Sequence, residues 1–179
     1  MTGRAAEGTP AYLPQLPVIT HPNMTAEYYQ DQYRVLHGKM PMFGTGVEES
    51  LDPIPEADFH RPVGHRTIAQ LIGHMVAWRK NSALRFQKLP RPKIELGSPE
   101  DWPDYSRKTK ADMLAELAET KELLLDALAA VDYGTLEERI HPDYYYHNRH
   151  ALDGAVQHDI YHLGQINLIA SVLRNTAPH

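Results

Sequence analysis

Two histidines spaced four residues apart, His158 and His162, are the strongest chemical signal in this chain. They lie in residues 155–165, a stretch that otherwise has the pattern of a helix. Residues at positions i and i+4 share one face of a helix, so both imidazoles can reach a single point. Burying two imidazoles without partners is costly, and a metal ion is the partner that would satisfy both.

The same helical face has the steps of four and three that a bundle helix turns toward its neighbours. Its members are Ala151, Ala155, His158, His162, Gln165 and Ile169. His74 is the expected third ligand, because it lies on another predicted helix with Leu71 and Trp78 on its own face. Gly73, next to it, would allow a neighbouring backbone to approach closely. Three neutral imidazoles with other positions open to water are typical of a catalytic metal site rather than a sealed one.

The remaining histidine patterns are weaker. Glu138 and His141 have the Glu-x-x-His spacing of di-iron bundles, but the element occurs once, and Pro142 pushes His141 out of helical geometry. His150 is two turns from His158, about 12 Å along a helix axis, which is too far to share an ion. An alternative hypothesis without any metal, in which the histidines form a polar cluster in the core, stays open.

Four amphipathic segments are predicted to position these histidines. They begin near Thr25, at Thr67, near Thr109 and near Asn148, and the last three end near residues 87, 131 and 174. Thr67 and Gln70 have the capping-box form. The first segment has Tyr29, Tyr33, Leu36 and Met40 on one face, and the third has Met113, Leu117, Thr120, Leu124, Ala127 and Val131. Whether residues 47–52 resume a helix stays open.

The fold class predicted from these segments is all-α, an up-down four-helix bundle over residues 24–175. The connection from about residue 88 to 108 is rich in proline and long enough to be a crossover. Residues 1–23 carry four prolines and no helical period, so we expect an irregular, extended N-terminal arm. Gly154 and Gly164 lie inside the last helix, where close helix crossing is the favoured explanation and clearance for a ligand the alternative.

Composition excludes several functions. The 179 residues carry a net charge of −5 and no Lys/Arg stripe, so a nucleic acid is not an expected partner. Cysteine is absent, which leaves imidazole, carboxylate and water as metal ligands. No apolar run approaches the roughly 18 residues that span a bilayer, and the N-terminus has no signal-peptide pattern, so we expect no membrane association and a cytoplasmic protein.

With these elements in place, the chain resembles the DinB/YfiT-like superfamily of metal-dependent enzymes. The resemblance rests on a His-x-x-x-Trp element at residues 74–78 and a His-x-x-x-His-x-Gly-Gln-Ile element at residues 158–166. Their order, and the number and length of the helices, agree over about residues 25–174.

The resemblance implies a four-helix bundle that holds one divalent metal ion through His74, His158 and His162. Nickel or zinc is the expected metal, with iron or manganese as alternatives. Relatives act as S-transferases or isomerases that use a low-molecular-weight thiol, or are described as hydrolases, so the implied partner is a small molecule such as a thiol. We also consider a homodimer.

Our leading hypothesis is a metal-dependent enzyme that activates a thiol or a water. The alternative is a non-catalytic, metal-stabilised bundle acting as a binding or structural module. The sequence does not identify a general base, although Asp159, Tyr161 and His37 are candidate neighbours of the pocket.

Overall fold

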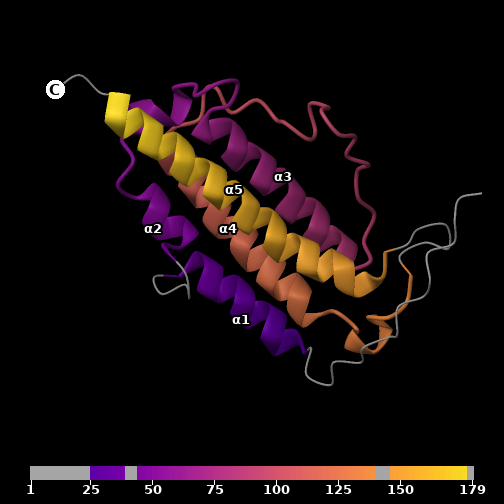
Figure 1. Cartoon of the computed structure of the whole chain (residues 1–179). Helices are drawn as coiled ribbons and strands as arrows, with labels where there is room; N and C mark the ends of the chain where they lie inside the picture. Colours follow the sequence, from indigo (N-terminus) through magenta and orange to yellow (C-terminus); the bar gives the residue numbers. More distant parts are fainter. Residues whose placement is uncertain (1–24, 39–43, 140–145, 177–179) are drawn as a thin grey trace, which may run out of the picture.

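Four long helices make up the bundle in the computed structural model of the chain, which describes residues 25–38, 44–139 and 146–176 (Figure 1). They are α1 (Ala26–His37), α3 (Ile68–Phe86), α4 (Lys110–Ala129) and α5 (Asn148–Thr176). A short helix, α2 (Val47–Leu51), and two 3-10 helices, η1 (Glu56–His60) and η2 (Tyr133–Thr135), lie in the connections. These described ranges contain no strand, so the predicted all-α bundle is confirmed. The expected arm over residues 1–23, Met40 and His141 lie outside the described residues.

Threonine side chains start three of the helices. Thr67 caps α3 in a complete capping box with Gln70, as the sequence predicts. Thr109 forms a second capping box with Asp112 at the start of α4, and Thr25 accepts a hydrogen bond from the Tyr28 backbone N–H at the start of α1. Each cap satisfies backbone N–H groups that have no partner within the helix, which fixes where the helix begins.

The long connection after α3 is a crossover. Lys110, at the start of α4, donates to the backbone carbonyls of Asp52 and Ile54, just before the η1 segment that leads into α3. The helices α3 and α4 therefore begin at the same end of the bundle and run in the same direction, while α1 and α5 run in the opposite one (Figure 1). The up-down alternation expected from the sequence therefore does not hold between α3 and α4. As a result the helix that carries His74 and the helix that carries His158 and His162 are antiparallel neighbours.

The core consists of two apolar clusters separated by a polar layer. One cluster lies where α3 and α4 begin and includes Ile72, Met75, Met113, Leu163 and Ile166. The other lies toward their ends and includes Tyr29, Tyr33, Ala83, Leu124 and Leu152. Arg79 on α3, Thr120 on α4 and Asp159 on α5 are buried between the two clusters. In the described parts of the chain, no helix is both long enough and apolar enough to cross a membrane.

Glycine is required at one position on α3. A Cβ atom added at Gly73 would lie 2.7 Å from Cδ2 of the Tyr105 ring, so the glycine permits the connection after α3 to pack against this helix. The close neighbour is a side chain rather than the backbone expected from the sequence. Gly154 and Gly164 differ, because a Cβ at either position would meet no atom within 4 Å. The expectation that these two glycines serve close helix crossing is wrong.

Alanine at Gly73 should destabilise the protein by about 1–3 kcal/mol, because the added methyl group overpacks against a buried ring. Alanine at Gly164 is the matched control, since it adds the same methyl group to a helix interior without a contact. It should be neutral or stabilise by up to about 1 kcal/mol. Urea unfolding of both variants measures the two effects. Equal effects in the two variants would show that the Tyr105 ring does not fill this space.

Candidate metal centre

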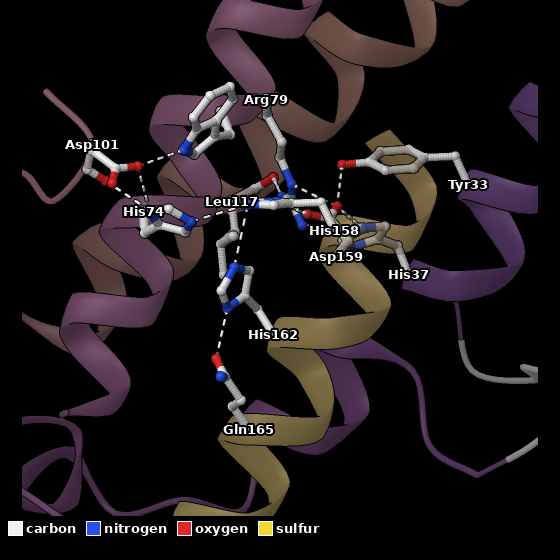
Figure 2. Close-up of polar contacts among 11 residues, drawn as sticks. Tyr33, His37, His74, Arg79, Asp101, Leu117, His158, Asp159, His162 and Gln165 are labelled. Atoms are coloured by element: carbon white, nitrogen blue, oxygen red, sulfur yellow. Dashed lines mark hydrogen bonds and ion pairs between the residues drawn. The ribbon is translucent and has the colours of Figure 1, made fainter. Parts of the chain in front are cut away.

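Three imidazoles converge between α3 and α5 (Figure 2). The Nε2 atom of His158 lies 3.0 Å from Nε2 of His74 and 3.2 Å from Nε2 of His162. All three atoms lie within 4.8 Å of one another. The structure therefore brings together the three histidines that the sequence singles out.

Oxygen atoms occupy the other side of two of these rings. Nδ1 of His74 lies 2.7 Å from the Asp101 carbonyl oxygen, and Nδ1 of His162 lies 2.7 Å from Oε1 of Gln165. These oxygens can only accept hydrogen bonds, so each Nδ1 carries the hydrogen and each Nε2 presents a lone pair. Acceptors of this kind orient the histidine ligands of metal sites in the same way.

The Nε2 lone pairs of His74 and His162 are both directed at Nε2 of His158, and a cation bound by all three atoms would satisfy them. The separations of 3.0 and 3.2 Å are near the nitrogen–nitrogen distance of about 3.3 Å expected around a tetrahedral zinc ion with bonds of about 2.0–2.1 Å. The geometry and the donor set both fit a divalent ion, and the cluster could hold one.

The connection after α3 supplies the surroundings of His74. Asp101 is buried, and its carboxylate accepts hydrogen bonds from the Trp78 indole N–H and the Gly97 backbone N–H, both at 2.7 Å. Burial alone would raise the pKa of Asp101, but these hydrogen bonds outweigh it and hold the pKa below its usual value. The Trp102 ring stacks on His74 with the ring centroids 4.1 Å apart. Neither Asp101 nor Trp102 is among the site residues predicted from the sequence, although an acidic residue beside a tryptophan in a proline-rich connection was an available signal.

Burial keeps two of the three imidazoles neutral. Burial and, to a smaller extent, the neighbouring His158 together lower the pKa of His162 to about 4. Burial also lowers the pKa of His74. Only neutral imidazole can bind a metal ion, so both rings are in the binding form at neutral pH.

A buried ion pair lies directly behind the three histidines. Asp159 on α5 is fully buried, and its Oδ2 atom accepts hydrogen bonds from Nε of Arg79 at 2.9 Å and from the Tyr33 hydroxyl at 2.7 Å. Nε2 of His37 lies 3.2 Å from the same oxygen. Burial would raise the pKa of Asp159, but the Arg79 charge and the neighbouring His158 and His37 together outweigh it, hold the pKa well below its usual value and keep the carboxyl ionised. These contacts tie α1, α3 and α5 together (Figure 2).

The second carboxylate oxygen of Asp159 faces His158. This buried Oδ1 atom has no hydrogen-bond partner in the described structure, and Nδ1 of His158 lies 3.8 Å from it. That distance is too long for a hydrogen bond, yet a small rotation of the imidazole would form one. Asp159 is therefore placed to orient His158 as Asp101 orients His74.

The residues that surround this site only partly match those expected. Of the candidate neighbours of the pocket, His37 lies beside Asp159, whereas the Tyr161 side chain is exposed and lies outside the polar layer. Arg79 is not among the residues predicted from the sequence, although a charged residue on the apolar face of α3 was an available signal. The predicted seam of α5 matches the buried face only in part. The buried positions of α5 include His162 and Ile169 of that seam, whereas His158 is partly exposed. The other buried positions are Leu152, Asp159, Leu163, Ile166, Ala170 and Leu173.

Acidification should destabilise the metal-free protein partly through His37. Burial lowers the pKa of His37, and the facing charge of Arg79 adds to this, while Asp159 opposes it. The unfolded state, with a histidine pKa of about 6.5, then binds the proton first as the pH falls, so the free energy of unfolding decreases below about pH 6.5. His37→Gln should make this decrease shallower, as measured by urea unfolding between about pH 7 and 5. His65→Gln, at an exposed position, should leave it unchanged; an equal decrease in both variants would contradict the assignment.

Comparison with known protein families matches one of them to this chain. The sequence model of the DinB superfamily covers residues 45–166, more than half of the chain, and this range includes all three histidines of the cluster. Searches of the curated proteins and of the solved structures return no match.

Proposed function

Because the chain belongs to the DinB superfamily, we propose that it is a metal-dependent enzyme that acts on a small molecule. In this proposal His74, His158 and His162 bind one divalent ion, and a position of that ion stays open for a thiol or a water. The observation that carries the proposal is the convergence of three Nε2 atoms at 3.0 and 3.2 Å, with the lone pairs of His74 and His162 fixed by acceptors on Nδ1.

The side chains available as ligands support a coordination position that the protein leaves open. In the part of the chain that the structure describes, no other His, Cys, Asp or Glu joins the three histidines. The nearby carboxylates of Asp101 and Asp159 face the Nδ1 side of the rings, away from the point where the Nε2 atoms meet. Three imidazoles favour zinc or nickel, and water or substrate would complete the coordination.

A divalent ion at this point supplies Lewis acidity, which favours the deprotonated form of a thiol or a water near neutral pH. The chain's own residues hold the ligands and shape the site. Asp101 orients His74 through its carbonyl group, and Trp102 covers the face of that ring. Asp159 is a poor proton acceptor, because Arg79 stabilises its ionised form, so its role is to position His158.

The alternative is an ion that only ties α3 to α5. The geometry supports this structural role in one respect, because the three ligands come from these two helices. We expect the bundle to keep its helical structure when the metal is removed, because the two apolar clusters do not depend on the ion. Circular dichroism before and after chelation tests this. Loss of the helical signal at room temperature would favour the structural role.

The enzymatic proposal is tested with cobalt-substituted protein. Addition of a low-molecular-weight thiol such as 2-mercaptoethanol should change the visible absorption of the cobalt, because sulfur would enter the open position. His162→Ala, assayed alongside, should show neither the starting spectrum nor the change. A cobalt spectrum that no thiol, water-competing anion or pH change can alter would mean that the site is closed, and it would overturn the proposal.

A further inference from the structure

A cleft between α3 and α5 leads away from the three histidines. It has a volume of about 250 Å³, and the side chains of Trp78 and His158 line one part of it. Arg85 on α3 and Ala151 on α5 also line it. Ala151 and His158 are seven residues apart on one helix, so the cleft extends about 10 Å from the candidate metal centre.

The charge within this cleft is not balanced. Arg79 and Asp159 line it as well, but they neutralise each other in the buried ion pair. Arg85 is half-buried, and its guanidinium has no hydrogen bond or ion pair with any residue that the structure describes. Burial lowers the pKa of Arg85, and the nearby positive charge of Arg91 lowers it further. A partly desolvated guanidinium without a partner favours an anion at this point.

The opposite wall of the cleft is made of small residues. Ala151, Gly154 and Ala155 of α5 form it, and a Cβ atom at Gly154 would meet no atom within 4 Å. Glycine in the middle of a helix costs about 1 kcal/mol relative to alanine. Since helix packing does not require Gly154, its effect here is to widen the cleft.

We propose that this cleft is the substrate site and that it takes a small organic molecule with a carboxylate at one end. Arg85 would bind the carboxylate, and the reacting group at the other end of the molecule would lie beside His158. A carboxylate fits better than a dianionic phosphate, because a single unneutralised guanidinium lines the described part of the cleft and its planar N–H fork matches a carboxylate. This inference rests on the proposed function, since it names the substrate class of the same site.

The test compares two thiols of equal length with the zinc-loaded, full-length protein. 6-Mercaptohexanoate carries a terminal carboxylate, and 6-mercaptohexanol carries a hydroxyl group in its place. Calorimetric titration should show that the wild-type protein binds the acid about 10- to 100-fold more tightly, as expected for a charge-assisted hydrogen bond. Arg85→Gln should reduce this preference to less than about 2-fold, and Arg85→Lys should keep part of it. Arg107→Gln, which removes an exposed charge outside the cleft, should preserve the preference.

A wild-type protein that binds both thiols equally, or a preference that survives Arg85→Gln, would overturn the inference and leave the proposed function standing. A separate titration of the zinc-free protein with hexanoate tests the cleft without the metal. Binding that is weakened by Arg85→Gln but not by Arg107→Gln supports the anion site, even if neither thiol reaches the zinc. In that case the proposed function fails while the assignment of Arg85 holds.

Discussion

Replacement of His158 by alanine should lower the affinity for zinc or nickel by more than about 100-fold. Loss of a residue that only hydrogen-bonds to a metal ligand typically lowers the affinity by about 10- to 100-fold, and loss of a ligand itself should have a larger effect. His158 is central in the cluster, because its Nε2 atom lies 3.0 and 3.2 Å from the other two. Without it, the remaining pair of imidazoles would bind an ion with one ligand fewer. Competition with a chromophoric chelator measures the affinity of each variant.

His65→Ala is the matched control for this substitution. It removes an exposed imidazole and should leave the affinity and a stoichiometry of one ion per chain unchanged. The chain must be purified without a histidine tag, since a tag would bind the same metals. Full retention of one equivalent of metal by His158→Ala would show that the ion binds elsewhere or that His158 is not a ligand.

Replacement of Arg79 by methionine should destabilise the metal-free protein by about 3–5 kcal/mol, because it leaves the buried Asp159 carboxylate without its cation. Arg79 and Asp159 are both almost completely buried, and their side chains meet at 2.9 Å. The Tyr33 hydroxyl alone would then satisfy the charge, with His37 beside it. Urea unfolding gives the loss directly, as the midpoint shift multiplied by the unfolding slope.

A double replacement separates the ion pair from general damage to the core. Arg79→Met together with Asp159→Leu removes both charges. The double variant should therefore lose clearly less free energy of unfolding than the sum of the losses in the two single variants. Thr120→Val, on the same polar layer but uncharged, controls for the change in polarity. If the double variant is as unstable as the sum of the singles, the two residues do not act as a pair.

The sequence predicts the helices and the three histidines because both signals are local. Thr67 and Gln70 start α3 through contacts within one turn, and the apolar face of α4 follows a simple helical period. The spacing of His158 and His162 places both imidazoles on one face whatever the rest of the fold does. His74 could be added because it lies on an apolar helical face, where an imidazole needs a partner.

The residues around the histidines could not be predicted in the same way, because long-range packing places them. Asp101 and Trp102 lie in a connection without a period, and only the folded chain brings them to His74. Hydropathy assigns a charged residue such as Asp159 to the surface, so the predicted face of α5 leaves out this buried position. Its burial depends on Arg79, which lies 80 residues away in the sequence.

X-ray absorption of zinc-reconstituted, untagged protein tests the central claim most directly. We predict one zinc ion per chain, with three imidazole nitrogens at about 2.0–2.1 Å and at least one further light-atom ligand from solvent. Addition of a thiol should replace that ligand with sulfur at about 2.3 Å. A first shell with fewer than three imidazoles, or one completed by protein atoms that no thiol displaces, would contradict an open three-histidine metal centre.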